Sequence, residues 1–254
     1  MATYLVTGAS RGLGLAIAAQ LAASPDSEVS LIFATSRKAS APELTELAEN
    51  SSGRVVPVQL DAKDPDSLRA AIEMVRHHLQ QEGKGLDVLI NNAGYMPVTD
   101  GKIEKADDLT DVFHTNVTQT HLVTREFLPL LREGERKTIA NITSSVGSIS
   151  QSARTMMPTH AYKISKAALN MMTVQYALQY EEEGFCVLAI SPGWLRTDMG
   201  GEFADLSAET GARAVLEYVK NASKELNGRF LNIHVPDWEH ESRPDQYDGK
   251  DIPW

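Results

Sequence analysis

The chain has 254 residues, 42% of them hydrophobic and 23% charged, which is typical of a soluble globular protein with a substantial core. Its formal net charge of −10 argues against a general surface for nucleic acid or anionic membrane, so any phosphate contacts must be local. Cys186 is the only cysteine, which excludes an intrachain disulfide and suggests no cysteine-based metal site. With no secretory signal and no apolar run approaching ~18 residues, we expect a cytoplasmic protein without a metal.

A glycine-rich turn lies between the first predicted strand (4–6) and the first predicted helix (15–23). Gly8 would allow a tight turn, Gly12 the close approach of a ligand, and Gly14 close helix packing. Glycines of an ordinary turn are the alternative, but a place directly after the first strand favours a site for a dinucleotide pyrophosphate at the helix N-terminus. The predicted cofactor contacts of this turn are Gly8, Ser10, Arg11, Gly12, Leu13 and Gly14.

The second predicted strand (28–34) is followed by basic residues and by no acidic one. In dinucleotide folds an acidic residue here would bind the ribose hydroxyls, whereas an arginine accommodates a 2′-phosphate. Arg37 therefore favours NADP(H) over NAD, with solvated surface charge as the alternative. Asp61, just after a third strand (55–60), is a candidate adenine contact.

The central part of the chain alternates between helices and strands. Helices are predicted at 42–50 and at 66–81, the second capped by Asp64, and a buried strand is predicted at 86–90. The sequence NNAG follows that strand, and small or amide residues there let the backbone pass close to a ligand. Asn92, Ala93 and Gly94 are therefore predicted cofactor contacts, with an ordinary asparagine turn as the alternative.

Asn116 lies in the middle of a predicted long helix (104–132). Asparagine is a poor residue for a helix interior because its side chain competes for backbone groups. It is either held there by a specific hydrogen bond or tolerated on the solvent face, and the sequence leaves both open.

The segment from Asn141 to Lys166 carries the candidate catalytic groups. A buried strand is predicted at 138–142, and Ser144 and Ser145 follow it, where an open α/β sheet binds its ligands. Tyr162 and Lys166 are spaced to lie one turn apart on one helical face. Taken alone, such a pair also suits a helix surface. In a shared site, the ammonium is expected to lower the tyrosine pKa.

The final part of the chain contains a strand (185–190), a helix (208–222) and a last strand (228–235). Pro192 and Gly193 break the first of these strands where a loop would pass over a cofactor, and residues 199–206 look like a mobile connection. Residues 236–254 form a polar tail with little periodicity. The predicted cofactor contacts of the loop are Pro192, Gly193, Leu195 and Thr197.

Strand and helix alternate along the whole chain without a linker-like change in composition. This pattern predicts an α/β fold over residues 1–254, a single domain with a Rossmann-type doubly wound parallel sheet and helices on both faces.

The motifs together resemble the short-chain dehydrogenase/reductase family across nearly the whole chain. The final GKDIPW and the FLNI strand are similar to the carbonyl-reductase-like branch that includes the sniffer and C-factor proteins and fungal ketoreductases. The motifs that carry the family resemblance are TGASRGLG at 7–14, NNAG at 91–94, HTNV around Asn116, SSVG at 144–147, YKISK at 162–166 and PGWLRT at 192–197.

The resemblance implies an NADPH-dependent carbonyl or ketone reductase that transfers hydride to a small, apolar or aromatic carbonyl compound. It makes Tyr162 the proton donor, Ser144 the group that orients the carbonyl, and Lys166 the ligand of the nicotinamide ribose. Asn116 would hold a water that links Lys166 to solvent. Ser144 is preferred over Ser145 because the family serine usually precedes a glycine by three positions, and Gly147 fits.

Two other functions remain open on this fold. The chain could be an NADP-binding sensor or signalling protein with little turnover, or it could catalyse epimerisation or dehydration. The span from Ser144 to Tyr162 is longer than in common members, so residues 152–158 are expected to alter the substrate mouth. The resemblance also implies a homodimer or homotetramer packed through the helices that contain Asn116 and Tyr162.

Overall fold

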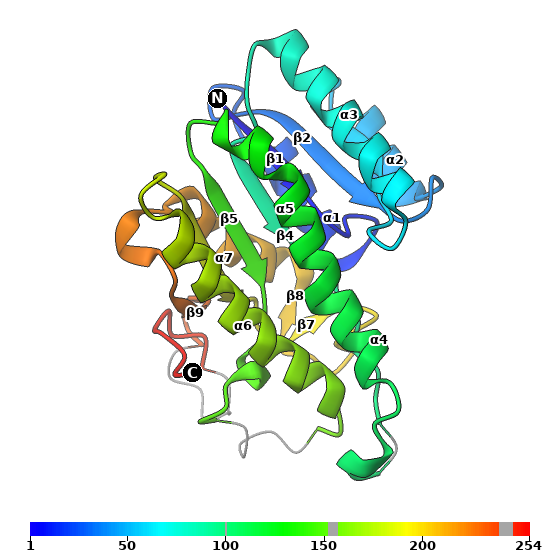
Figure 1. The fold of residues 1–254 in the computed structure, drawn as a ribbon, viewed down its shortest axis with the longest axis vertical. Helices are drawn as coiled ribbons and strands as arrows, with labels where there is room; N and C mark the ends of the chain where they lie inside the picture. Colours follow the sequence, from blue (N-terminus) through cyan, green and yellow to red (C-terminus); the bar gives the residue numbers. More distant parts are fainter. Residues whose placement is uncertain (100, 152–156, 239–245) are drawn as a thin grey trace.

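The computed structural model describes residues 1–99, 101–151, 157–238 and 246–254 (Figure 1). Seven strands form one sheet in the order β3-β2-β1-β4-β5-β6-β9, and every neighbouring pair is parallel. The predicted doubly wound parallel sheet is therefore confirmed. Its strands are β1 (Ala2–Val6), β2 (Val29–Ser36), β3 (Val55–Gln59), β4 (Val88–Asn91), β5 (Thr138–Ile142), β6 (Cys186–Ser191) and β9 (Phe230–Asn232).

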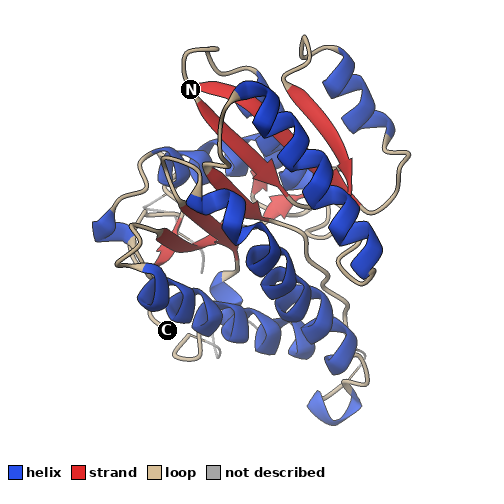
Figure 2. Ribbon diagram, turned by 45° about the horizontal axis from the view of Figure 1, so that its top comes forward, coloured by secondary structure: helices blue, strands red, loops and turns tan. Residues whose placement is uncertain are grey.

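Helices cover both faces of the sheet (Figure 2) because its strands are almost wholly apolar and bury both faces. One apolar core lies under α1 (Gly12–Ala22), α2 (Pro42–Glu49) and α7 (Ala208–Lys220). The other lies under α3 (Pro65–Glu82), α5 (Gln119–Arg132) and α6 (His160–Tyr180). The strand order reverses between β1 and β4, so the carboxyl ends of these strands border the crevice where such sheets bind ligands.

The long helix predicted at 104–132 is interrupted in the structure, which corrects that prediction. Helix α4 (Leu109–Phe113) leads into a π-helical turn, His114–Thr118, and then into α5. Asn116 lies in this π turn and is almost completely buried. Its side chain bonds to groups outside the helix, as described below, and such wide turns are frequent at functional sites.

The last residues pack against the body of the protein, although their polar composition gave no sign of it. Asp251 forms an antiparallel bridge to Leu231 of β9, and the Trp254 ring stacks on Phe230 with centroids 5.3 Å apart. The Ser150 N–H donates to the Trp254 carbonyl oxygen (3.1 Å). The tail is thus tied to the loop that follows β5. A small parallel pair, β7 (Leu195–Arg196) and β8 (Leu206–Ser207), lies beyond the end of β6.

Candidate active site

Tyr162 and Lys166 lie on α6, as predicted, and both side chains are directed inward. Tyr162 is 8% exposed and Lys166 is 4% exposed. The Lys166 ammonium lies 5.4 Å from the centroid of the Tyr162 ring and donates a hydrogen bond to the Ile142 carbonyl oxygen (2.7 Å) at the end of β5. The pair is therefore not a surface pair, and α6 carries it to the carboxyl end of the central strands.

The Ser144 side chain lies beside Tyr162 and lowers the pKa of the tyrosine by hydrogen bonding. It precedes a short 3₁₀ turn, Ser145–Gly147, and its hydroxyl also accepts weakly from the Val146 N–H (3.4 Å). A Cβ atom at Gly147 would lie 2.9 Å from the Lys166 backbone, so glycine lets this turn pack directly on α6. Ser145 takes a different position, since its N–H donates to Ser191 Oγ (2.9 Å).

Burial controls the protonation of both groups. It raises the pKa of Tyr162 to about 12, against a smaller lowering by the bond to Ser144. It also lowers the pKa of Lys166 to about 8. The prediction of a lowered tyrosine pKa is therefore wrong for this structure, because desolvation of the buried phenol is the largest effect on it. Tyr162 is protonated and neutral at neutral pH.

Asn116 is held by specific hydrogen bonds, which resolves the two alternatives left by the sequence. Its Oδ1 accepts from the Tyr95 N–H (2.8 Å), and its Nδ2 donates to the Tyr95 carbonyl oxygen (2.9 Å) and to Ser165 Oγ (2.9 Å). The side chain thus pairs with the backbone of Tyr95 and joins the segment after β4 to α6. The water-holding role that the family resemblance implies for Asn116 stays a prediction beside this bridge.

The glycine-rich turn is tied to the end of β4. Asn92 Nδ2 donates to the carbonyl oxygens of Thr7 (2.9 Å) and Gly8 (3.2 Å). Thr7 Oγ1 accepts from the N–H groups of Asn92 (2.9 Å) and Ala93 (3.0 Å). Thr7 was missed as a functional residue from the sequence, although it opens the TGASRGLG motif. Its role could be recognised only once β1 and β4 were known to be neighbours in the sheet.

Three loops meet at the carboxyl ends of the central strands. A Cβ atom at Gly8, whose φ is +66°, would lie 2.9 Å from the Ala93 backbone. A Cβ at Gly12 would lie 3.3 Å from the Thr197 methyl group, and one at Gly94 would lie 3.8 Å from Lys166 Nζ. The turn after β1, the segment after β4 and the loop after β6 therefore meet beside the Tyr162 site.

The start of α1 is suited to binding a phosphate group. Helix α1 begins at Gly12, and the preceding Arg11 makes no side-chain capping bond to it. Its first N–H groups can therefore bind an anion, aided by the helix dipole. A Cβ atom at Gly14 would lie 2.3 Å from the Gly8 carbonyl oxygen and 2.5 Å from Asn92 Nδ2, so only glycine permits this loop geometry.

The remaining predicted contacts lie around the same edge in different settings. Arg37 follows β2 and is exposed, while Asp61 after β3 accepts from the Lys63 N–H (2.9 Å). Arg11 is paired with Asp198 at the surface. The Leu195 side chain is buried in the core, so only its backbone can contact a ligand there. Partly buried backbone or side chains are presented by Ser10, Leu13, Pro192, Gly193 and Thr197.

Some expectations concern residues outside the described ranges. The predicted lengthening of the substrate mouth falls mainly on residues 152–156, which the structure does not describe. Within the described ranges, no cluster of three or more His, Cys, Asp or Glu side chains is arranged to hold a metal ion. No helix in those same ranges is both long and apolar enough to cross a membrane.

The chain is similar to known proteins over most of its length. A family model described as short chain dehydrogenase matches residues 2–208. Short-chain dehydrogenase anuI of Penicillium roqueforti is 32% identical over 238 residues, which cover 90% of this chain and 92% of that protein.

Solved structures show the same relationship. The NADPH-bound carbonyl reductase from chicken fatty liver superposes with a TM-score of 0.84 at 32% identity, covering 99% of this chain and 98% of that one. The carbonyl reductase Sniffer of D. melanogaster superposes with a TM-score of 0.85 at 28% identity, and both chains are fully covered. These matches agree with the observed sheet, and the chain belongs to the short-chain dehydrogenase family of oxidoreductases.

Proposed function

We propose that this protein is an NADPH-dependent carbonyl reductase that uses Tyr162 as its general acid. The observation that carries the proposal is the cluster of Tyr162 and Lys166, both buried and 5.4 Å apart from ammonium to ring centroid, with Ser144 beside Tyr162 at the carboxyl end of the sheet. A protein that only binds a nucleotide has no need of a proton donor held in this way. The likeness to carbonyl reductases supports the same function.

Most of the residues that would hold NADPH lie on the three loops that meet beside the Tyr162 site. The α1 N-terminus would bind the pyrophosphate, and Arg37 would bind the 2′-phosphate. Lys166 would bind the nicotinamide ribose. When bound, the cofactor supplies the reducing equivalents. Further contacts are proposed for Gly8, Ser10, Arg11, Leu13, Asp61, Asn92, Ala93, Gly94, Pro192, Gly193, Leu195 and Thr197.

The proposed acid is in the protonation state that reduction requires. With a pKa raised to about 12 by burial, Tyr162 keeps its proton at neutral pH and can donate a hydrogen bond to a carbonyl oxygen. Ser144 can bond to the same oxygen, and both bonds strengthen as negative charge develops there. The proton then passes from the Tyr162 hydroxyl to that oxygen. The Tyr162 phenolate that remains then takes up a proton from water before the next turnover.

The substrate proposed for this site is a small apolar or aromatic carbonyl compound. Exposed apolar side chains lie on the segments that border the site, with Tyr95 after β4 and Trp194 and Met199 after β6. Such side chains bind an apolar ligand by removing its surface from water.

Titration with NADPH and NADH, followed by a spectrophotometric screen of aldehydes, ketones and quinones, tests this function. We expect tight binding of NADPH to the wild type and to Tyr162→Phe, with carbonyl-dependent oxidation of NADPH lost only in the variant. Tyr176→Phe is the matched control. Its hydroxyl lies on the same helix, bonds to His121 Nδ1 (2.8 Å) and also has a pKa raised to about 12, yet it stands outside the proposed site.

Three outcomes would contradict the proposal in different ways. Binding of NADPH without turnover of any carbonyl compound would favour the sensor function. Conversion of a substrate without net consumption of NADPH would favour epimerisation or dehydration. No binding of either cofactor would overturn the proposal as a whole.

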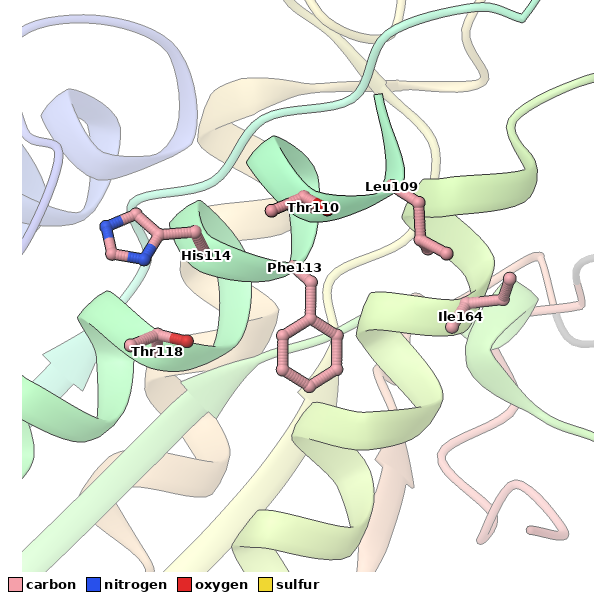
Figure 3. A pocket seen from close by; sticks show the side chains of 6 residues that line it. All are labelled: Leu109, Thr110, Phe113, His114, Thr118 and Ile164. Atoms are coloured by element: carbon pink, nitrogen blue, oxygen red, sulfur yellow. The ribbon is translucent and has the colours of Figure 1, made fainter. Parts of the chain in front are cut away.

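We also propose a homodimer or homotetramer that packs through α6 and the helical segment from α4 to α5, which contains Asn116. These helices present the exposed apolar side chains Phe113, Ile164, Met171 and Leu178. A groove of about 460 Å³ lies between them, lined by Leu109, Thr110, Phe113, His114, Thr118 and Ile164 (Figure 3). The candidate catalytic side chains do not line this groove.

A cytoplasmic location is proposed because Cys186, the only cysteine, leaves the chain without an intrachain disulfide.

A further inference from the structure

Tyr247 lies in the tail and is almost completely buried, with 1% of its surface exposed. Its backbone has a φ of +42°, in the left-handed region that residues other than glycine rarely adopt. A conformation of this kind persists where the surrounding contacts hold it, and it often marks a functional position. The contacts of the Tyr247 side chain therefore show what this position does.

The Tyr247 hydroxyl joins two points of the loop that follows β6. It accepts a hydrogen bond from the Trp194 N–H (3.1 Å) and donates one to Asp205 Oδ2 (2.9 Å). Its ring also packs beneath the start of the loop, since a Cβ atom at Gly193 would lie 3.0 Å from Tyr247 Cε1. One side chain thus contacts the loop at both of its ends.

Hydrogen bonds within the loop join its first residues to its last ones. Trp194 Nε1 donates to the Gly200 carbonyl oxygen (2.8 Å), and Arg196 donates to the carbonyl oxygens of Ala204 (2.9 Å) and Asp205 (2.7 Å). The parallel pair of β7 and β8 brings its two ends together. The structure therefore shows a loop held by its own hydrogen bonds where the sequence suggested a mobile connection. Because the loop is held in this way, a hydrogen bond to Tyr247 helps to position the whole loop.

The same loop borders the candidate active site. Thr197 faces Gly12 at the start of α1, and Trp194 and Met199 present exposed apolar surface. A shift of the loop would therefore change the cofactor space and the substrate side together.

We propose that Tyr247 is a positioning residue of the reductase site. Its hydroxyl holds the segment 193–205 in the position that binds cofactor and substrate, without touching either of them. This inference rests on the proposed function. It predicts that loss of the hydroxyl weakens binding of both ligands while the acid step at Tyr162 continues.

The test compares Tyr247→Phe with Tyr218→Phe. Tyr218 is a matched control because its hydroxyl also bonds to the tail, at the Gly249 carbonyl oxygen (2.9 Å), and to the Asn232 carbonyl oxygen (2.9 Å), but not to the loop. We expect Tyr247→Phe to raise the Kd for NADPH and the KM for the carbonyl substrate about tenfold, because the loop loses both of its hydrogen bonds to the hydroxyl. The kcat should change less than about twofold because Tyr162 is untouched.

A second readout does not depend on catalysis. Hydrogen–deuterium exchange of the protein without ligands should be faster across 193–206 in Tyr247→Phe than in the wild type or in Tyr218→Phe. Asp205→Ala should reproduce this effect and Asp205→Asn, which keeps an acceptor oxygen, should restore slow exchange. These Asp205 variants test the contact from the loop side if Tyr247→Phe does not fold.

Two results would overturn the inference. One is exchange across 193–206 that is the same in Tyr247→Phe and Tyr218→Phe, and the other is faster exchange with unchanged Kd and KM. Failure of the proposed function is a separate result, since it would be seen as a wild-type protein that binds no NADPH whatever the exchange data show.

Discussion

The ammonium of Lys166 lies 5.4 Å from the centre of the Tyr162 ring and donates its hydrogen bond to the Ile142 carbonyl oxygen instead of to the phenol. The two groups thus share a buried site without being directly paired. Each titrates according to its own desolvation, which raises the pKa of the tyrosine and lowers that of the lysine. The effects of these two pKa shifts on stability and on activity can be measured separately.

The lowered pKa of Lys166 predicts a pH-dependent stability. Between its folded value of about 8 and its ordinary value of 10.5, the unfolded chain binds the proton that the folded chain has lost. The free energy of unfolding therefore rises with pH in this window, by at most about 3 kcal/mol. Urea unfolding of the wild type and of Lys166→Met between pH 7 and pH 10 should show this rise only in the wild type.

Lys163→Met provides the control, because Lys163 lies on the same helix and is less buried. Parallel curves for the wild type and Lys166→Met would contradict the lowered pKa. Above pH 10 the raised pKa of Tyr162 acts in the opposite sense, since the folded chain then holds the additional proton and the stability falls toward pH 12.

Replacement of Ser144 should separate the two neighbouring serines. Ser144→Ala removes the side-chain bond to Tyr162 and one donor to the carbonyl oxygen, so kcat should fall roughly 10²- to 10³-fold. Ser145→Ala keeps the backbone bond to Ser191 and should retain most of the activity. Steady-state kinetics with one carbonyl substrate measure the loss of kcat in both variants and show which serine orients the carbonyl. A larger loss in Ser145→Ala would reverse the assignment of the orienting serine.

Arg37 should determine the choice between the two cofactors. Removal of a charge-assisted bond to the 2′-phosphate is expected to weaken NADPH binding about 10- to 100-fold in Arg37→Ala and to leave NADH binding unchanged. Calorimetric titration measures both affinities. Arg132→Ala is the control, since this arginine pairs with Glu183 on the segments that precede β5 and β6, away from the carboxyl ends of the strands. Equal weakening for both cofactors would argue that Arg37 acts on the fold and not on the phosphate.

Asn116→Ala should destabilise the fold through its lost bridge. The change removes three hydrogen bonds of a buried side chain and leaves the Tyr95 backbone groups without these partners, so the free energy of unfolding should fall by about 2–4 kcal/mol. Asn170→Ala removes one bond, to Thr143 Oγ1 (2.6 Å), and should cost less. Denaturant unfolding compares the two variants. A smaller loss for Asn116→Ala than for Asn170→Ala would contradict the structural importance of the bridge.

The helices and the sheet were largely predictable from local patterns. Apolar runs such as 138–142 become strands buried on both faces, and Asp64 caps α3 as expected, because hydrophobic period and capping act over a few residues. The interruption of the helix at Asn116 was not predictable in form. A π turn depends on partners such as Tyr95, which lies 21 residues away.

The sequence by itself determined the parallel α/β fold, the glycine turn and the helical pairing of Tyr162 with Lys166, because each depends on residues close together in the chain. Only the tertiary structure decided the protonation of that pair, since burial depends on every segment packed around it. It also decided the place of Tyr247, which lies in a tail without periodicity. Its hydroxyl meets Trp194 across 53 residues, and a contact of this separation leaves no local pattern in the sequence.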